Sequence, residues 1–224
     1  MSIFGDPEYW PDDDLIGWSE EPTPEMLVAG YREGVFPMPI EDVFGWFSPL
    51  NRAIVPLHGM HISRSLRRSA RKYTISSNRA CAEVIRRCAD PTRPGWWISD
   101  DITRLYLELH RLGFVHSIEV WDEQGRLAGG LYGVRVGRLF AGESMFHDPE
   151  YGTDASKVAL MALVFTMQRI GDVLLDVQWQ TPHLESLGAI EMPREIYLRA
   201  AAHAAARPGG PWPAQPPWTG SPPG

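Results

Sequence analysis

Residues 116–146 constrain the fold more than any other stretch, because they predict three consecutive antiparallel strands. Ile118, Val120 and Leu127 alternate with polar neighbours, which is the period of a half-buried sheet. Residues 123–126 contain a glycine and predict the first turn, and Gly137 predicts the second reversal. The rest of the chain is therefore expected to pack around a mainly antiparallel sheet and to add functional residues to it.

This predicted meander is rich in glycine and ends beside a lone acid. Gly129, Gly130, Gly133 and Gly142 lie inside the expected strands, where glycine usually marks a bulge or the close approach of another backbone or a ligand. Glu143 follows directly, and we regard it as a candidate for chemistry. The alternative is a structural carboxylate that pairs with a buried arginine or a backbone N–H.

The flanking segments predict mostly helices. Thr23 and Pro24 form a helix start that Gly34 ends. Other helices are expected over the following residues: 63–68, 79–89, 100–111, 154–169 and 183–187. Strands are expected near 53–56 and over 173–179, and residues 194–206 are a strand or a helix. This order predicts an α+β or α/β fold, an acyltransferase-like, mainly antiparallel splayed sheet flanked by helices.

Composition divides the chain into three parts. Residues 1–48 are expected to form a small N-terminal domain, which begins with an irregular arm docked by Tyr9, Trp10 and Trp18. Residues 49–206 form the predicted catalytic domain. Residues 207–224 are so rich in proline and glycine that we expect them to be disordered.

Charge is segregated along a chain whose net charge is −7. Residues 1–31 contain eight acids and no Lys or Arg, whereas residues 61–87 contain eight bases and one acid. A basic patch on an acidic protein can hold a phosphate backbone, although a solvated helix face is an equally good interpretation of the run alone. The bases that we expect to bind nucleic acid are Arg64, Arg67, Arg68, Arg71 and Lys72.

The sequence also predicts a cytoplasmic protein. It contains no apolar run long enough to span a membrane and no signal peptide. Cys81 and Cys88 lie on one expected helix, too far apart for a disulfide. No metal motif, nucleophile elbow or Walker loop is present, so we expect neither a metal nor a cofactor.

Asp176 and Gln178 alternate in LLDVQW, which would place both side chains on one face of an apolar strand. Two polar groups in that position form either a satisfied buried network or a functional site. The residues alone leave both possibilities open.

Several short segments together resemble the leucyl/phenylalanyl-tRNA–protein transferase family. They are GVFPMP, WFSPLNRAIVP, HISRSLRR, WWI, HSIEVW, GGLYGV, LFAGESMF, ASKVAL, LDVQ and HLESLGA, and they cover about residues 24–200. The resemblance implies the transfer of Leu or Phe, and less well Met, from aminoacyl-tRNA to proteins that begin with Arg or Lys. Such tagging marks the acceptor for degradation by the N-end rule pathway. A monomer is expected.

The resemblance also assigns roles to residues. It implies that Asp176, Gln178 and Glu143 are catalytic, with Asp176 polarising Gln178, Gln178 positioning the attacking amine and Glu143 stabilising a cationic group. The residues implied in substrate binding are Trp97, which would stack on the terminal adenosine, and Leu131, Met38, Met145, Trp46 and Ser144. Met38, Phe47 and His147 depart from the usual family pattern, so adenosine stacking and amino-acid preference are expected to shift.

Two other functions compete with this interpretation. An acyl-CoA N-acyltransferase would use the same sheet, but it cradles pyrophosphate with a glycine-rich turn at the start of the long helix. Here that position reads HDPEYGTDASK, which has one glycine and several acids. A non-catalytic RNA-binding module would need only the basic segment.

Overall fold

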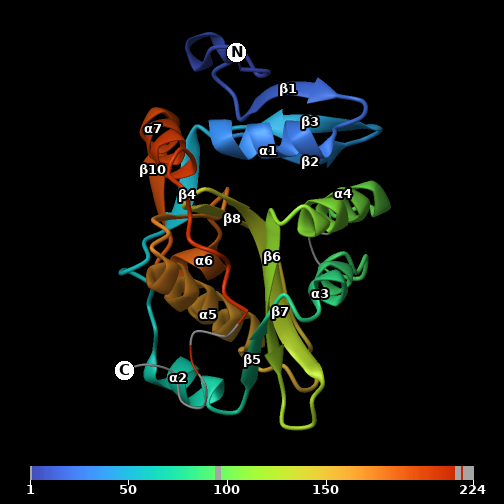
Figure 1. Cartoon of the computed structure of the whole chain (residues 1–224), viewed down its shortest axis with the longest axis vertical. Coiled ribbons are helices and arrows are strands. Elements are labelled where there is room, and N and C mark those ends of the chain that lie inside the picture. Colours follow the sequence, from blue (N-terminus) through green and yellow to red (C-terminus); the bar gives the residue numbers. More distant parts are fainter. Residues whose placement is uncertain (1, 94–96, 215–217, 219–224) are drawn as a thin grey trace.

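The computed structural model describes residues 2–93, 97–214 and 218, and it contains two sheets (Figure 1). The smaller sheet has the order β1-β3-β2 and the larger one the order β10-β4-β9-β8-β7-β6-β5. The strands are β1 (Leu15–Ser19), β2 (Phe36–Ile40), β3 (Val43–Phe47), β4 (Asn51–Val55), β5 (Thr74–Ser77), β6 (Val115–Trp121), β7 (Leu127–Val136), β8 (Leu139–His147), β9 (Leu174–Asp176) and β10 (Ile190–Pro193).

Helices lie on both sides of the larger sheet, with α3 and α4 on one side and α5 on the other (Figure 1). The α-helices are α1 (Pro24–Glu33), α2 (Arg64–Ala70), α3 (Cys81–Cys88), α4 (Asp100–Arg111), α5 (Ala155–Ile170), α6 (Pro182–Ser186) and α7 (Arg194–Ala205), and Pro7–Tyr9 form a short 3₁₀ helix. The predicted fold class, a mainly antiparallel sheet flanked by helices, is confirmed. The segment left open between strand and helix is mostly α7.

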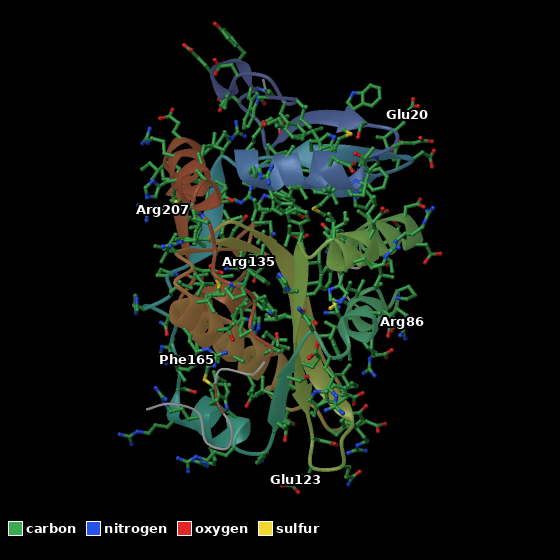
Figure 2. The ribbon with its side chains drawn as sticks, in the orientation of Figure 1. Glu20, Arg86, Glu123, Arg135, Phe165 and Arg207 are labelled. Atoms are coloured by element: carbon green, nitrogen blue, oxygen red, sulfur yellow. The ribbon has the colours of Figure 1, made fainter. Side chains whose placement is uncertain are left out.

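The predicted meander is confirmed as β6, β7 and β8, which pair antiparallel in sequence order. Gly125 (φ +75°) and Gly137 (φ +61°) provide the two turns with a left-handed backbone that glycine adopts without strain. Figure 2 shows Glu123 at the free tip of the first hairpin. Gly129 allows α5 to approach the sheet, since a Cβ on it would lie 2.7 Å from the Cβ of Ala155.

The larger sheet splays between β8 and β9, its one parallel pair among the described strands. Their pairing extends only from Leu139–Leu174 to Ala141–Asp176, although β8 continues to His147. The expected strand over 173–179 is therefore wrong in length, because β9 ends at Asp176. Beyond that point the chain follows β4 instead, as Val177 N–H donates to Ala53 O (3.0 Å).

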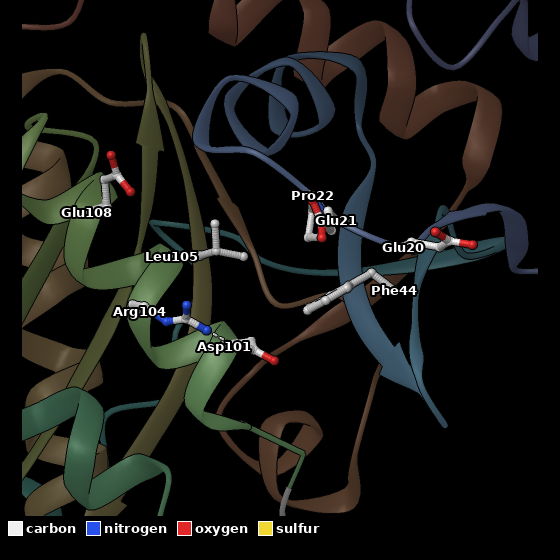
Figure 3. Close-up of a pocket in the computed structure, with 8 residues that line it drawn as sticks. All are labelled: Glu20, Glu21, Pro22, Phe44, Asp101, Arg104, Leu105 and Glu108. Atoms are coloured by element: carbon white, nitrogen blue, oxygen red, sulfur yellow. Dashed lines mark hydrogen bonds and ion pairs between the residues drawn. The ribbon is translucent and has the colours of Figure 1, made fainter.

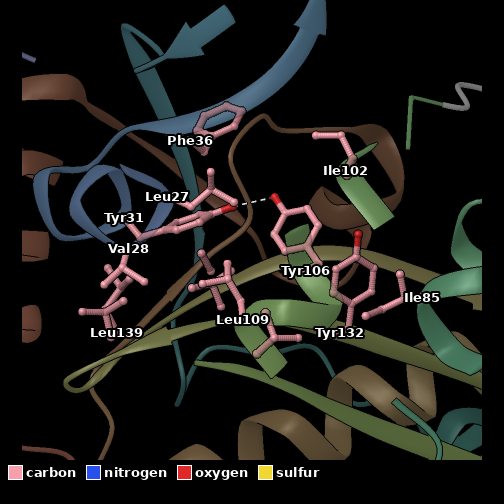
Figure 4. Packing of buried hydrophobic residues seen from close by; sticks show 14 of the residues in the cluster. Leu27, Val28, Tyr31, Phe36, Ile85, Ile102, Tyr106, Leu109, Tyr132 and Leu139 are labelled. Carbon is pink, nitrogen blue, oxygen red and sulfur yellow. Dashed lines mark hydrogen bonds between the residues drawn. The ribbon is translucent and has the colours of Figure 1, made fainter. Parts of the chain in front are cut away.

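The core is continuous between the two sheets. Leu27, Tyr31 and Phe36 from the N-terminal part pack in one cluster with Tyr106 and Tyr132 of the larger sheet and its helices (Figure 4). On the other face, α5 is buried on most of its circumference, as its apolar sequence predicted. Thr23 caps α1 by accepting from Met26 N–H, and Gly34 ends it at φ +79°, both as predicted.

Aromatic side chains contribute to the packing of both terminal segments. In the N-terminal arm, the expected packing of Trp10 is confirmed and Phe4 packs as well, whereas the expectation is wrong for Tyr9 and Trp18, which are exposed. In the tail, Trp212 packs on the larger sheet and Trp218 packs on Phe165 of α5. Residues 215–217 and 219–224 of the segment expected to be disordered lie outside the described residues. Trp212 stacks on His116 at 4.3 Å and donates to Ser77 Oγ (2.6 Å). Apolar rings that cover a sheet face stabilise the tail in spite of its proline content.

Cys81 and Cys88 are free thiols buried on one face of α3, as expected. Burial raises the pKa of Cys81 to about 12 and that of Cys88 to about 11. No helix in the described ranges has the length and apolar character needed to cross a bilayer.

Candidate functional site

A β-bulge in β8 aims Glu143 into the site. In the pairing of β7 with β8, Tyr132 lies opposite Ser144 and Gly133 opposite Gly142, so Glu143 is the extra residue. A bulge turns its side chain away from the regular alternation of the strand. The bulge lies two residues beyond Ala141, the last residue of β8 that pairs with β9, so Glu143 stands beside the place where the two strands separate.

Two tyrosines hold this carboxylate. Tyr31 on α1 donates to Glu143 Oε1 and Tyr106 on α4 donates to Oε2, each at 2.8 Å. The two hydroxyls also lie 2.7 Å from each other (Figure 4). Burial raises the pKa of Glu143 to about 7, although both tyrosine hydrogen bonds act to lower it. Near neutral pH this group can therefore both accept and release a proton.

Gln178 is the third residue whose side chain is hydrogen-bonded to the Glu143 carboxylate. It follows the end of β9 with a left-handed backbone (φ +60°), and its Nε2 donates to Glu143 Oε1 at 3.3 Å. A glutamine rarely adopts this conformation, and such positions concentrate at functional sites. Asp176 stabilises the turn, since its Oδ1 accepts from the backbone N–H of Gln178 at 2.9 Å.

Asp176 belongs to a buried ionic cluster and does not contact the side chain of Gln178. Arg52 on β4 donates to both of its oxygens (2.8 and 2.6 Å), and Tyr197 on α7 donates to Oδ2 (2.8 Å). Burial alone would lower the pKa of Arg52, but the pairing with Asp176 raises it, so the guanidinium stays charged. Contrary to the prediction, Asp176 therefore does not polarise the side-chain amide of Gln178 by direct contact. It contacts the backbone N–H of Gln178 instead.

Four residues of this site were not predicted from the sequence: Arg52, Tyr31, Tyr106 and Tyr197. Arg52 could have been identified from the sequence, because a charged side chain in the mostly apolar strand NRAIV needs an ionic or hydrogen-bonding partner. The three tyrosines could not be identified in this way, since each occupies a helix position that an ordinary core residue would fill.

An apolar cavity of about 180 Å³ opens beside Glu143 and Gln178. Its walls come from β7, β8, α5, the end of β9 and α6, and they include the expected residues Leu131, Ser144 and Met145. The other apolar side chains that line it are Leu160, Leu163, Leu175, Val177 and Leu184. A hydrophobic hollow with few polar groups is typical of a small-molecule subsite, and the volume fits one amino-acid side chain.

Three residues assigned to substrate binding lie outside the lining of this cavity. Met38 and Trp46 belong to the N-terminal sheet, and Trp97 precedes α4. Trp46 is only 2% exposed, with its ring against Phe4 and its Nε1 bonded to Ser19 Oγ (3.0 Å). This ring leaves almost no surface on which a base could stack, so the expected role of Trp46 in direct contact with substrate does not fit this conformation.

The predicted nucleic-acid-binding bases lie on and just after α2, which packs on α5. Arg64, Arg68, Arg71 and Lys72 are exposed. Among the described residues, none of these four lies within ion-pair distance of a carboxylate. Ser63 caps α2 as predicted, by accepting from Leu66 N–H.

A second cavity, of about 540 Å³, lies between the N-terminal part and α4 (Figure 3). Phe44 and Leu105 provide apolar walls, and carboxylates surround them. The acids of this cavity are Glu20, Glu21, Asp101 and Glu108, and Arg104 is paired with Asp101. In the described part of the chain, no group of three His, Cys, Asp or Glu side chains is arranged to hold a metal ion.

Comparison with solved structures finds loose likenesses. L-PGS from Bacillus licheniformis shares 11% identity with a TM-score of 0.43, covering 70% of this chain and 65% of that one. The spermidine/spermine N-acetyltransferase SpeG from Vibrio cholerae shares 16% identity with a TM-score of 0.38, covering 58% and 98%. At this level of similarity they carry no argument about activity.

Comparison with curated relatives is far more specific. The leucyl/phenylalanyl-tRNA–protein transferase of Novosphingobium aromaticivorans is 50% identical over 191 residues, which is 81% of this chain and 70% of that protein. The enzyme of the same name from Chlorobaculum tepidum is 47% identical over 180 residues, or 78% and 91%. Residues 54–202 match the model of leucyl/phenylalanyl-tRNA protein transferase, and residues 20–50 match that of its N-terminal domain. With both parts matched in order, the chain belongs to the leucyl/phenylalanyl-tRNA–protein transferase family.

Proposed function

We propose that this protein transfers leucine or phenylalanine, and less well methionine, from aminoacyl-tRNA to the α-amino group of proteins that begin with Arg or Lys. Family membership supports the reaction. The contact that carries the proposal is the hydrogen bond between Gln178 and Glu143 beside an apolar cavity. An aminoacyl ester is already activated, so an enzyme needs chiefly to position it and to manage one proton.

Glu143 is the proposed proton carrier. The neutral α-amine of the acceptor attacks the ester carbonyl, and a C–N bond forms. The proton lost by the amine passes to Glu143, and from there to the 3′-oxygen of the ribose as the C–O bond breaks. A free α-amine has a pKa of about 7.7–8.0, close to the value of about 7 for Glu143. Because the two pKa values are close, Glu143 can both take the proton from the amine and release it to the leaving oxygen.

Gln178 is the proposed positioning group. Its amide offers a carbonyl oxygen to the incoming amine while its Nε2 is bound to Glu143. An amide is too weak a base to take the proton itself. Asp176, Arg52 and Tyr197 act through Gln178, because their cluster fixes the backbone turn from which it projects.

The apolar cavity is the proposed subsite for the transferred side chain, with Leu131 and Met145 in its wall. Trp97 and Met38 remain proposed contacts of the terminal adenosine. The exposed bases Arg64, Arg67, Arg68, Arg71 and Lys72 are the proposed contacts of the tRNA backbone, and phosphate contacts of this kind are indifferent to sequence. We propose a small N-terminal domain and a catalytic domain that act together as a monomer in the cytoplasm, where aminoacyl-tRNA is found.

One experiment separates this function from its competitors. The protein is incubated with an Arg-initiated peptide and either labelled Phe-tRNA or labelled acetyl-CoA. Label on the peptide from Phe-tRNA alone is expected. Label from acetyl-CoA alone would identify an acyl-CoA acyltransferase, and tRNA binding with label from neither donor would identify a non-catalytic RNA-binding module.

A further inference from the structure

Three hollows follow one another along the surface from the apolar cavity to α2. The apolar cavity shares Met145 and His183 with a polar hollow of about 470 Å³. That hollow shares Asp154 and Lys157 with a third, of about 180 Å³, which reaches Ser63 and Ser65 at the start of α2. Because neighbouring hollows share lining residues, the three adjoin one another between Glu143 and the start of the basic helix, and we call this series of hollows the groove.

Arg93 lies where this groove leaves the apolar cavity. Its guanidinium donates to Met145 O (2.6 Å) and to Cys88 O (2.8 Å), which fixes it beside the strand that carries Glu143. Among the described residues no carboxylate lies within ion-pair distance of Arg93. A guanidinium has five N–H donors, so this half-buried cation has both charge and donors left for an anion in the groove.

The other charges of the groove favour an anion as well. Asp148 and Asp154 are its two acids, and they are paired with Arg87 (2.7 Å) and Lys157 (3.0 Å) respectively. Asp154 also accepts from Ser69 Oγ (2.9 Å). These pairs compensate the two acids, and Lys157, which makes one hydrogen bond to Asp154, keeps further N–H donors for a phosphate. Arg93 interacts with the more distant carboxylate of Asp90 but forms no ion pair among the described residues. A cationic acceptor peptide would be repelled here, whereas a phosphodiester strand would be attracted.

From these contacts we infer that the groove holds the single-stranded 3′ end of the aminoacyl-tRNA, with Arg93 on the phosphate nearest the aminoacyl ester and Lys157 on one further along. The strand then reaches α2. This inference rests on the proposed function, and it assigns a phosphate path to residues outside both the catalytic pair and the basic helix.

The test compares three donors with an Arg-initiated peptide as acceptor. Phe-adenosine has no phosphate, Phe-CCA has only the single-stranded phosphates, and Phe-tRNA has the whole backbone. The variants are Arg93→Gln and Lys157→Met in the groove, Arg68→Gln on α2, and Arg111→Gln as a control on an exposed end of α4. Wild-type transfer from Phe-tRNA tests the proposed function separately.

Each groove variant is expected to raise KM for Phe-CCA and Phe-tRNA about tenfold, as for the loss of one charge-assisted hydrogen bond. Its kinetics with Phe-adenosine should not change. Arg68→Gln should raise KM only for Phe-tRNA, and Arg111→Gln should change nothing. The dependence of log(kcat/KM) on log[salt] should fall in slope by about 0.7 for each lost contact.

If KM rose equally for all three donors, the variants would be disturbing β8 or the whole fold. That result would overturn the inference. Unchanged KM for Phe-CCA in both groove variants would overturn it too. Arg93→Gln could act through its carbonyl contacts to Met145 and Cys88, which Lys157 does not touch. Lys157→Met is therefore combined with Asp154→Asn, so that no unpaired carboxylate remains in the groove, and the KM of this double variant for Phe-CCA decides the outcome.

Discussion

The side-chain amide of Gln178 donates to the carboxylate of Glu143 across 3.3 Å, and this bond links β8 to the turn that follows β9, next to the place where the two strands separate. A bulge supplies one partner and a left-handed turn the other. Both are local irregularities that a regular sheet would not contain, and both expose polar groups to an apolar cavity.

Replacing Glu143 with Gln should reduce transfer by about 10²- to 10⁴-fold, the range expected for loss of a general base. In the wild type kcat/KM should rise with pH around the Glu143 pKa of about 7. The measurement is kcat/KM between pH 5.5 and 9 with Phe-adenosine as donor. A variant that keeps both the rate and the pH dependence would exclude Glu143 as the proton carrier.

The same substitution should stabilise the protein at alkaline pH. The folded state raises the Glu143 pKa from about 4.5 to about 7, so folding is opposed increasingly as pH rises through this window. At pH 8 the variant should gain up to about 3 kcal/mol in free energy of unfolding, and below pH 4.5 it should gain none from this source. Urea unfolding at pH 4.5 and 8 measures the difference, and an equal gain at both would contradict it.

Arg52→Met should destabilise the fold by about 3–5 kcal/mol, because it leaves the buried charge of Asp176 unpaired. Tyr197→Phe removes one hydrogen bond from the same carboxylate and should lower stability by about 1 kcal/mol. The milder variant should keep KM for Phe-adenosine and lower kcat, since it loosens the turn that holds Gln178. If Tyr197→Phe raised KM alone, the cluster would act on binding and not on positioning.

Leu131→Phe should narrow the apolar cavity of about 180 Å³. The larger wall should reduce transfer of Phe more than transfer of Leu, and change their kcat/KM ratio by about tenfold or more. Competition between the two aminoacyl-tRNAs measures the ratio directly. Ile118→Val, in the core but outside the cavity lining, is the matched control and should leave the ratio unchanged.

Trp212→Ala should lower the free energy of unfolding by about 2–4 kcal/mol, because the ring packs on His116 and Phe140. KM for Phe-tRNA should stay the same, since Trp212 is not in the lining of either the apolar cavity or the groove. Thermal unfolding and KM are both measured. If the free energy of unfolding fell by less than about 0.5 kcal/mol, as it does for ordinary surface substitutions, the tail would contribute nothing to the stability of the fold.

The sequence by itself determined the regular parts of this protein. Period-2 alternation and two turn glycines are local signals, so β6, β7 and β8 could be predicted in order. The caps of α1 and α2 are local as well. Motifs that carry the family resemblance pointed to Glu143, Asp176 and Gln178, because each of these residues lies in a short recognisable segment.

Only the tertiary structure decided how these residues meet. The bulge at Glu143 depends on register across two strands, and the early end of β9 depends on which neighbour the chain follows, so neither is encoded in a window of a few residues. The partners Arg52, Tyr31 and Tyr106 come from distant elements. The docking of Trp212 likewise depends on an open sheet face. In each case the free energy comes from long-range burial, which sequence spacing does not report.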